Sequence, residues 1–135
     1  MIGADQVNVP ETVRQVRQVF EEYEAALRRH DVAMLNSMFM QREDTVRFGL
    51  TEHNYGAADI AVWRAMSAPI HPERRLIRAV IVTVGADVAS VCAEFESPDS
   101  LQRGRQSQTW IRTPAGWKII AAHVSVIDAD LLEDC

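Results

Sequence analysis

A tyrosine and an arginine lie inside segments that are otherwise apolar, and both side chains could do chemistry. Tyr23 falls on a face of a predicted helix that also carries Val16, Phe20 and Leu27, so its phenol is expected to point into the interior. A buried hydroxyl needs a hydrogen-bond partner. That partner is either a backbone carbonyl, which makes Tyr23 an ordinary core residue, or a ligand with which the phenol can exchange a proton.

Arg47 stands between Val46 and Phe48 in a short predicted strand. If both neighbours pack toward the helices, Arg47 faces the other way and is a surface charge. The alternative is a position inside a ligand site. A guanidinium binds a planar carboxylate through two parallel hydrogen bonds, so in that case we expect Arg47 to hold a substrate carboxylate.

The segment from Gly104 to Asp128 is predicted to form two long strands joined by a turn at residues 113–116. Strand alternation indicates that Arg105 and Ser107 point into a pocket. The intervening residues are then expected on the outer face of the sheet, with Val124 and Val126 beside them. They are Gln106, Gln108 and Trp110.

His123 follows Trp117 and Ile119 at strand spacing, which predicts that it shares their inner face. A lone histidine there is either a hydrogen-bonded core residue or a ligand contact. His53 and Trp63 belong to a loop and a helix that are expected beside the mouth of the pocket. The competing interpretation makes Trp63 a core residue.

Several classes of function find no support in the sequence. The 135 residues carry a net charge of -5 and a pI of about 5.3, which gives no basic surface for nucleic acid or an anionic membrane. No segment resembles a membrane span or a signal peptide, and two cysteines suit a cytoplasmic protein. The four histidines lack zinc-site spacing, and no phosphate loop or nucleophile motif is found. We therefore expect no metal and no cofactor.

Helices are predicted first and antiparallel strands afterwards, which is the α+β pattern. Residues 1–9 are expected to form a flexible leader, residues 10–128 a single domain and residues 129–135 an acidic tail. The predicted helices span residues 10–29, 32–40 and 57 or 58 to 68, and the predicted strands span residues 45–50, 74–84 and 88–97, before the terminal hairpin.

Three motifs stand within this order: Arg47-Phe48-Gly49, the run GRQSQTW at 104–110 and the run GWKIIAAHVS at 116–125. With them the chain resembles the SnoaL-like, or nuclear-transport-factor-two-like, superfamily, and within it the AtzH-like or oxalurate-catabolism HpxZ-like branch. The resemblance implies a curved sheet wrapped around the first helix to make a cone, usually dimerised through its outer face. It also implies a role beside amide hydrolases in the breakdown of ureides and triazine-derived ureas such as those from cyanuric acid.

Two functions follow as expectations. The first is a small cofactor-free enzyme that decarboxylates or hydrolyses a carboxylated urea, for example a dicarboxyurea to allophanate. Tyr23 and Arg47 would be its catalytic residues, and the residues expected to bind substrate are His53, Trp63, Arg105, Ser107 and His123. The second is a non-catalytic binding subunit or carrier that docks a partner amidohydrolase. In both cases we expect a homodimer through the outer sheet face.

Overall fold

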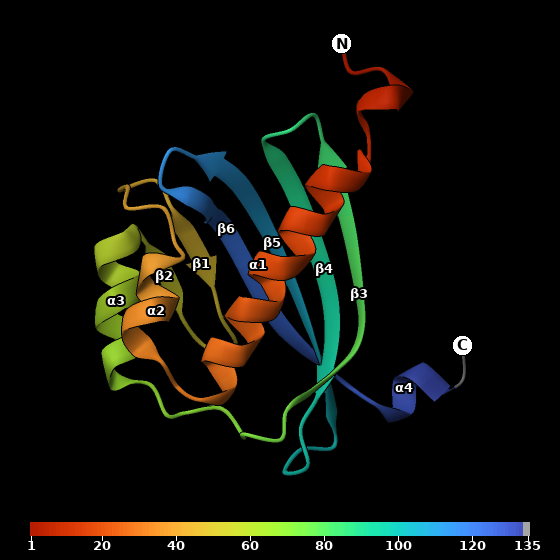
Figure 1. Cartoon of the computed structure of the whole chain (residues 1–135). Helices are drawn as coiled ribbons and strands as arrows, with labels where there is room; N and C mark the ends of the chain where they lie inside the picture. The colour runs from red at the N-terminus through yellow and green to blue at the C-terminus, as the bar shows by residue number, and fades with distance from the viewer. Residues whose placement is uncertain (134–135) are drawn as a thin grey trace.

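A six-stranded sheet curves around the first long helix (Figure 1). This computed structural model describes residues 1–133. The helical elements are η1 (Ala4–Gln6), α1 (Pro10–Arg28), α2 (Val32–Ser37), α3 (Ala57–Met66) and α4 (Asp130–Glu133). The strands are β1 (Val46–Phe48), β2 (His53–Tyr55), β3 (Arg75–Val84), β4 (Val88–Glu96), β5 (Gln102–Thr113) and β6 (Gly116–Asp128). The predicted α+β fold, with its curved sheet around the first helix, is confirmed.

The sheet has the order β2-β1-β6-β5-β4-β3, in which only β1 and β6 run parallel within the described chain. Helix α1 crosses the concave face in front of β3, β4 and β5, and α2 and α3 lie beside β1 and β2 (Figure 1). The concave face is therefore covered by helices, while the outer face is left uncovered. This arrangement places the core, and any pocket within it, between α1 and the sheet.

Helix α1 begins at Pro10, whose fixed φ suits the first helical turn. Its apolar residues recur at helical spacing, so one stripe is buried against the sheet, including Val16, Phe20 and Tyr23. The same stripe carries Glu24, which is only 1% exposed. A carboxylate is rarely buried so deeply unless it has a charged partner. The helix therefore brings both a phenol and an acid to the interior.

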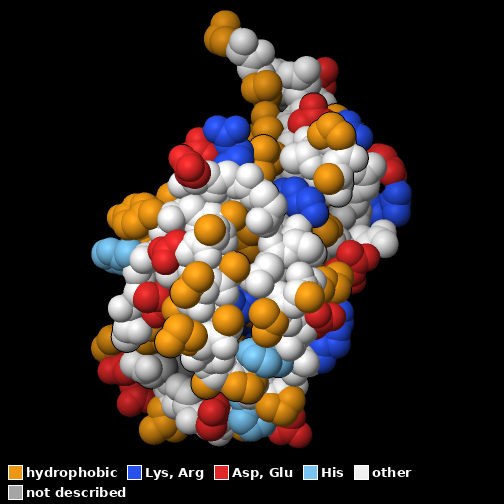
Figure 2. Space-filling view, turned by 90° about the vertical axis from the view of Figure 1, so that its left-hand side faces the viewer, with side chains coloured by type: hydrophobic (Ala, Val, Ile, Leu, Met, Phe, Trp, Pro, Cys, Tyr) orange, Lys and Arg blue, Asp and Glu red, His pale blue; other side chains and the backbone are white. Residues whose placement is uncertain are grey.

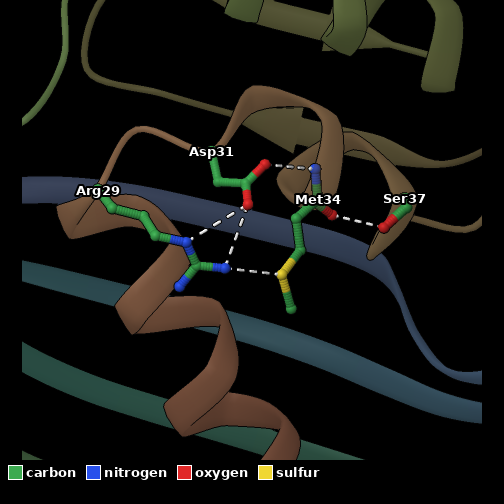
Figure 3. Close-up of polar contacts among 4 residues, drawn as sticks. All are labelled: Arg29, Asp31, Met34 and Ser37. Carbon is green, nitrogen blue, oxygen red and sulfur yellow. Dashed lines mark hydrogen bonds and ion pairs between the residues drawn. The ribbon is translucent and has the colours of Figure 1, made fainter.

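A tight corner joins α1 to α2 (Figure 3). Asp31 is the N-cap of α2, and its carboxylate accepts a 3.1 Å hydrogen bond from the backbone N–H of Met34. Arg29 donates to the same carboxylate from the end of α1. The Met34 N–H, followed by Arg29, lowers the pKa of Asp31. The corner is thereby fixed, with His30 in the left-handed region at φ 55°.

The β1–β2 hairpin differs from the prediction. A single strand was expected over residues 45–50, with a loop after it. The chain instead turns after Phe48 and returns as β2, so that Arg47 pairs with Asn54. Such short strands carry little periodicity for a sequence to reveal. The hairpin matters because it places Asn54 beside Arg47.

The register of β5 and β6 also departs from the prediction. Thr113 pairs with Gly116 across a two-residue turn, so residues of opposite parity face each other next to the turn. Trp117 lies on the α1 side, where its indole N–H donates to Gln15. The even-numbered residues of β5 therefore face α1. The sequence predicts the opposite facing, because the odd-numbered residues of both strands are expected on the inner face.

A bulge at Ile120 then changes the faces of β6. Trp110 pairs with Ile119, but the preceding residue, Thr109, pairs with Ala121, so Ile120 is passed over. Beyond the bulge, Ala122 lies on the inner face and His123 on the outer face. One extra residue reverses every later side chain in a strand.

The two ends of the chain lie beyond the sheet (Figure 1). The leader, expected to be flexible, is exposed but hydrogen-bonded to β3: Asn8 N–H donates to the Thr83 carbonyl at 3.0 Å, and Asn8 Oδ1 accepts from Thr83 N–H at 2.9 Å. Part of the predicted acidic tail forms α4, and residues 134–135 lie outside the described chain. No helix within residues 1–133 combines the length and the hydrophobicity that crossing a membrane requires.

Candidate functional site

A cavity of about 520 Å³ opens between α1, α3 and the concave face of the sheet. Its volume is in the range of small-molecule sites. In Figure 2, which turns the left-hand side of Figure 1 toward the viewer, hydrophobic side chains gather over the middle and lower part of this face and basic groups show only in part between them. The polar residues that line the cavity include Tyr23, His30, Arg47, Thr51, Glu52, Trp63, Arg64, Ser67, Arg74, Gln106 and Gln108.

Arg47 lines this cavity and is not a surface charge. Its Nη1 donates to Glu52 Oε1 at 2.8 Å and to Asn54 Oδ1 at 3.2 Å, and its guanidinium lies 3.6 Å from the centre of the Trp63 ring. Gly49 makes the ion pair possible, because a Cβ there would lie 1.8 Å from Glu52 Oε1. Arg47 is therefore held in place by a carboxylate, an amide and an aromatic face.

Glu52 responds to this pairing. Burial acts to raise the pKa of its carboxyl, but hydrogen bonds from Arg47 and Thr51 outweigh burial and lower the pKa overall. Glu52 is thus ionised at neutral pH, and it neutralises Arg47 from the loop at the cavity rim. Both side-chain bonds of Arg47 in the described chain use Nη1. Nε and Nη2 of Arg47 have no side-chain acceptor within residues 1–133.

Arg64 has no such partner. It is 4% exposed, and its Nε and Nη2 are buried without a hydrogen-bond acceptor anywhere in residues 1–133. Its guanidinium lies 5.2 Å from the Trp63 ring centre and 5.7 Å from that of Phe39. Burial lowers the pKa of Arg64, nearby Arg47 lowers it further, and the Tyr23 hydroxyl opposes both. A buried cation without an anion is costly, so this position calls for a negatively charged ligand.

Arg74 also lines the cavity, and it has a carboxylate partner. It donates to Glu24 through Nε at 3.2 Å and Nη2 at 2.9 Å, and Nη2 also donates to Gln106 at 3.0 Å. Gln106 Nε2 donates in turn to Glu24 at 2.7 Å. Phe95 covers the guanidinium at 3.6 Å. We call Glu24, Arg74 and Gln106 the buried triad.

Tyr23 lies between these two arginine environments, on the wall formed by α1. Its ring contacts Phe39 and Trp110 edge-on, at centroid distances of 6.5 Å and 6.1 Å. Only 5% of the residue is exposed, and it borders the cavity. Its hydroxyl is close enough to Arg64 to affect the pKa of that guanidinium. The sequence left open whether Tyr23 is a core residue or a site residue. The residue packs in the core and also faces the cavity.

The structure brings Tyr23, Arg47 and Trp63 together, but four predicted site residues are placed differently. Arg105 and Ser107 are exposed on the outer face, because β5 has the opposite facing to the one expected. The His53 ring stacks on Phe48, 5.0 Å away, also on that face. His123 borders the cavity through its place in β6, but its ring packs against the other side of Phe48, at 6.0 Å, because of the bulge.

The same correction removes the residues on which the predicted dimer surface was based. Trp110 is fully buried, and Gln106 and Gln108 are each 4% exposed, all on the concave side. Val124 lines the cavity. The outer face is formed by other residues, including Val80 and Val82 of β3, and stays largely exposed.

The sequence does not predict a role in the site for Arg64, the buried cation that lacks an ion-pair partner in residues 1–133. A signal was present, because Ala57, Ile60 and Arg64 follow the spacing of one buried helical stripe. No sequence pattern indicates that Glu52 and Asn54 bind Arg47, because their contacts with it depend on the β1–β2 hairpin. Across residues 1–133, no group of three His, Cys, Asp or Glu side chains could hold a metal.

Comparison with known proteins agrees with this architecture. A cystatin-like fold protein from Burkholderia xenovorans is 45% identical, with a TM-score of 0.88 over 90% of this chain and 95% of that one. A DUF3225-family protein of unknown function from Pectobacterium atrosepticum is 39% identical, with a TM-score of 0.91 over 94% and 99%. An NTF2-like protein of unknown function from Pseudomonas putida, at 18% identity and a TM-score of 0.69 over 85% and 86%, shares the fold.

No curated protein matches the sequence. The AtzH-like family model matches residues 5–130, which include every element from α1 to β6. This match covers nearly the whole chain and agrees with the resemblance carried by the Arg-Phe-Gly and Gly-Trp motifs. The chain belongs to the AtzH-like family.

Proposed function

We propose that this protein is a small enzyme that removes a carboxyl group from the nitrogen of a carboxylated urea, such as a dicarboxyurea, to leave allophanate. The observation that carries the proposal is the buried guanidinium of Arg64, which has no ion-pair partner within residues 1–133 and stands beside Tyr23 at the cavity wall. Membership of the AtzH-like family supports the ureide class of substrate. Every step of the proposed reaction is assigned to a side chain of this protein.

The charge balance of the cavity favours an anionic ligand. Arg47 is paired with Glu52 and Arg74 with Glu24, whereas Arg64 makes no ion pair within the described residues. One positive charge therefore remains at the site. A ligand carboxylate in the cavity beside Arg64 would supply the missing countercharge.

Arg64 is best suited to the carboxylate that stays on the product. The departing carboxylate loses its charge as it becomes carbon dioxide, so an ion pair with it would stabilise the substrate more than the transition state. That group fits better against the apolar wall formed by Leu27 and Leu35. Arg47 presents a second, partly neutralised cation that can orient the substrate without fixing the leaving group.

The reaction needs one proton and one bond cleavage. The bond between nitrogen and the departing carboxyl carbon breaks, and its electron pair stays on nitrogen, so the carboxyl leaves as carbon dioxide. Tyr23 donates its phenolic proton to that nitrogen and is reprotonated from solvent. The neighbouring Arg64 charge stabilises the transient phenolate. Positioning, proton transfer and electrostatics are the sources of rate in this scheme.

The test is a decarboxylation assay with the wild-type protein and Tyr23→Phe. Dicarboxyurea would be released in situ by saponifying its dimethyl ester, and allophanate and bicarbonate followed by ¹³C NMR against the spontaneous rate. We expect turnover by the wild type and a loss of roughly 10²–10⁴-fold in Tyr23→Phe. No acceleration by the wild type would refute the enzyme. Full activity in Tyr23→Phe would show that the phenol is a core residue only.

A second candidate function is a binding subunit that docks a partner amidohydrolase. It is favoured by exposed apolar side chains on the elements that border the cavity, namely Leu50 at 59%, Val62 at 61% and Met66 at 83% exposed. Under this function the cavity would bind a carboxylated urea without turnover. Ligand-dependent stabilisation in the absence of any decarboxylation would favour it over the enzyme.

A homodimer through the outer sheet face remains part of the proposal, on different residues from those first expected. Val80, Val82 and Val88 are 43%, 38% and 42% exposed on this face of β3 and β4. Valines grouped on an uncovered sheet face support self-association. Sedimentation of Val82→Lys against the wild type tests this, and a monomeric wild type at micromolar concentration would exclude the dimer.

A further inference from the structure

Two glutamines face the interior from β5, and their hydrogen bonding differs. Gln106 is closed within the buried triad, since its oxygen accepts from Arg74 and its nitrogen donates to Glu24. Gln108 also borders the cavity and is 4% exposed. Its Oε1 accepts a 3.0 Å hydrogen bond from Trp110 Nε1. An indole N–H can only donate, so this bond fixes which end of the Gln108 amide is oxygen.

The NH₂ end of Gln108 is therefore the end that is available to a ligand. No hydrogen bond joins Gln108 Nε2 to an acceptor within the described chain. Buried amide groups are nearly always hydrogen-bonded on both ends, and the side chain lies at the wall of a cavity. An amide donor held in a known orientation at this wall is available to an acceptor on a bound molecule.

The strand register shows where that acceptor would lie. Gln108 pairs with Ala122 of β6, and Ala122 pairs with Arg47 of β1. The three residues form one row across the concave face, with Gln108 and Arg47 about 10 Å apart at two strand spacings. Between them the methyl of Ala122 forms the floor of the cavity. Tyr23 reaches the same region from α1, because its ring contacts Trp110.

We infer that Gln108 Nε2 donates a hydrogen bond to the carbonyl oxygen of the bound urea, and that Trp110 is the residue that positions it. This inference rests on the proposed function and adds specificity to it. When the bond to the carboxyl carbon breaks, the electron pair left on nitrogen is delocalised onto the urea oxygen. A fixed donor at that oxygen stabilises this charge. The site thereby selects a carbonyl acceptor and disfavours a donor in its place.

The test uses two stable ligands of almost identical shape, N-carbamoylglycine and guanidinoacetate. Both carry one carboxylate, but the carbonyl of the first is replaced in the second by a guanidinium carbon, so that an NH₂ donor takes the place of the oxygen and the group carries a positive charge. Calorimetric titration of the wild type should show preference for N-carbamoylglycine by about tenfold or more. Gln108→Glu replaces the donor with an acceptor and should reverse the order. Gln108→Met, which keeps the length and removes both polar ends, should lower the ratio without abolishing it, because the cavity arginines still repel the guanidinium of guanidinoacetate.

Trp110→Phe removes the indole donor and lets the Gln108 amide rotate, so the preference should fall while the glutamine is still present. Gln6→Glu makes the same chemical change at an exposed position of η1 and should leave the ratio unaltered. An unchanged ratio in Gln108→Glu and Gln108→Met would overturn the inference. Binding that still depends on Arg64 in that case would leave the proposed function standing. A wild type that prefers guanidinoacetate would also overturn the inference.

Discussion

Two of the three buried arginines that line the cavity have opposite surroundings. Arg74 has its carboxylate, its amide and its aromatic cover supplied by Glu24, Gln106 and Phe95. Arg64 is buried to a similar depth, yet Nε and Nη2 have no acceptor in residues 1–133. Both desolvated cations are costly, but only the first is compensated within the fold.

The difference separates a structural charge from a functional one. A paired arginine such as Arg74 contributes to folding, and its loss leaves Glu24 buried without a partner. An uncompensated arginine such as Arg64 weakens the fold, and under the proposed function a bound anion would offset that cost. Stability and ligand binding should therefore respond in opposite senses to matched changes at the two positions.

The largest effect is expected at the buried triad. Arg74→Met leaves the Glu24 carboxylate without its cation and should lower the free energy of unfolding by about 3–5 kcal/mol, as measured by denaturant titration. The double variant Glu24→Leu, Arg74→Met removes both charges and should recover much of this loss. If the double variant is no more stable than the single one, the triad is not held by its ion pair.

Arg64→Met should have the opposite sign. It removes a buried cation with two unsatisfied donors, so without ligand the free energy of unfolding should rise by about 1–3 kcal/mol. Arg28→Met, an equivalent change at an exposed position of α1, is the control and should stay within about 0.5 kcal/mol of wild type. A marked destabilisation by Arg64→Met would mean that the protein does compensate this charge.

Arg47 has a carboxylate partner, as Arg74 does, but it also lines the cavity beside Trp63. The variant Arg47→Lys tests its role. Lysine keeps the charge but loses the planar group that lies on Trp63 and bonds Glu52 and Asn54. We expect binding of N-carbamoylglycine to weaken by about 1 kcal/mol, less than removal of the Arg64 charge would cost. Gly49→Ala should act in the same direction, because its Cβ displaces Glu52. Unchanged titration curves in both variants would place Arg47 outside the site.

The smallest effect concerns pH. The pKa of Glu52 is lowered in the folded protein from its ordinary value of 4.5. Its contribution to stability is therefore complete above about pH 4.5 and is lost as pH falls through the lowered folded value. The stability difference between wild type and Glu52→Gln should be constant at neutral pH and shrink in acid. A difference that grows on acidification would contradict the assigned shift.

The sequence predicted the helices and the long strands because their periodicity extends over many residues. It identified Tyr23 as inward-facing from helical spacing alone, and the structure places it at the cavity. The same reasoning missed β2, since three residues such as His53–Tyr55 give no period to detect. Asn54 was therefore not recognised as a partner of Arg47.

The facing of β5 and β6 could not be predicted for a different reason. β6 is largely apolar on both sides and β5 carries polar residues on both sides, so the pattern does not distinguish inside from outside. The turn register and the bulge at Ile120 decide it, and these placed Gln108 inside and Ser107 outside. Arg64 was ambiguous because an arginine in an apolar stripe is as compatible with a solvated helix end as with a buried site.

The central claim is that Arg64 binds the carboxylate of the ligand, and calorimetric titration of N-carbamoylglycine tests it most directly. The wild type and Arg28→Met should bind with equal affinity, and Arg64→Met should bind more weakly by about 1.5–3 kcal/mol, roughly 10- to 150-fold, while remaining folded. Equal affinity in Arg64→Met and the wild type would contradict the account.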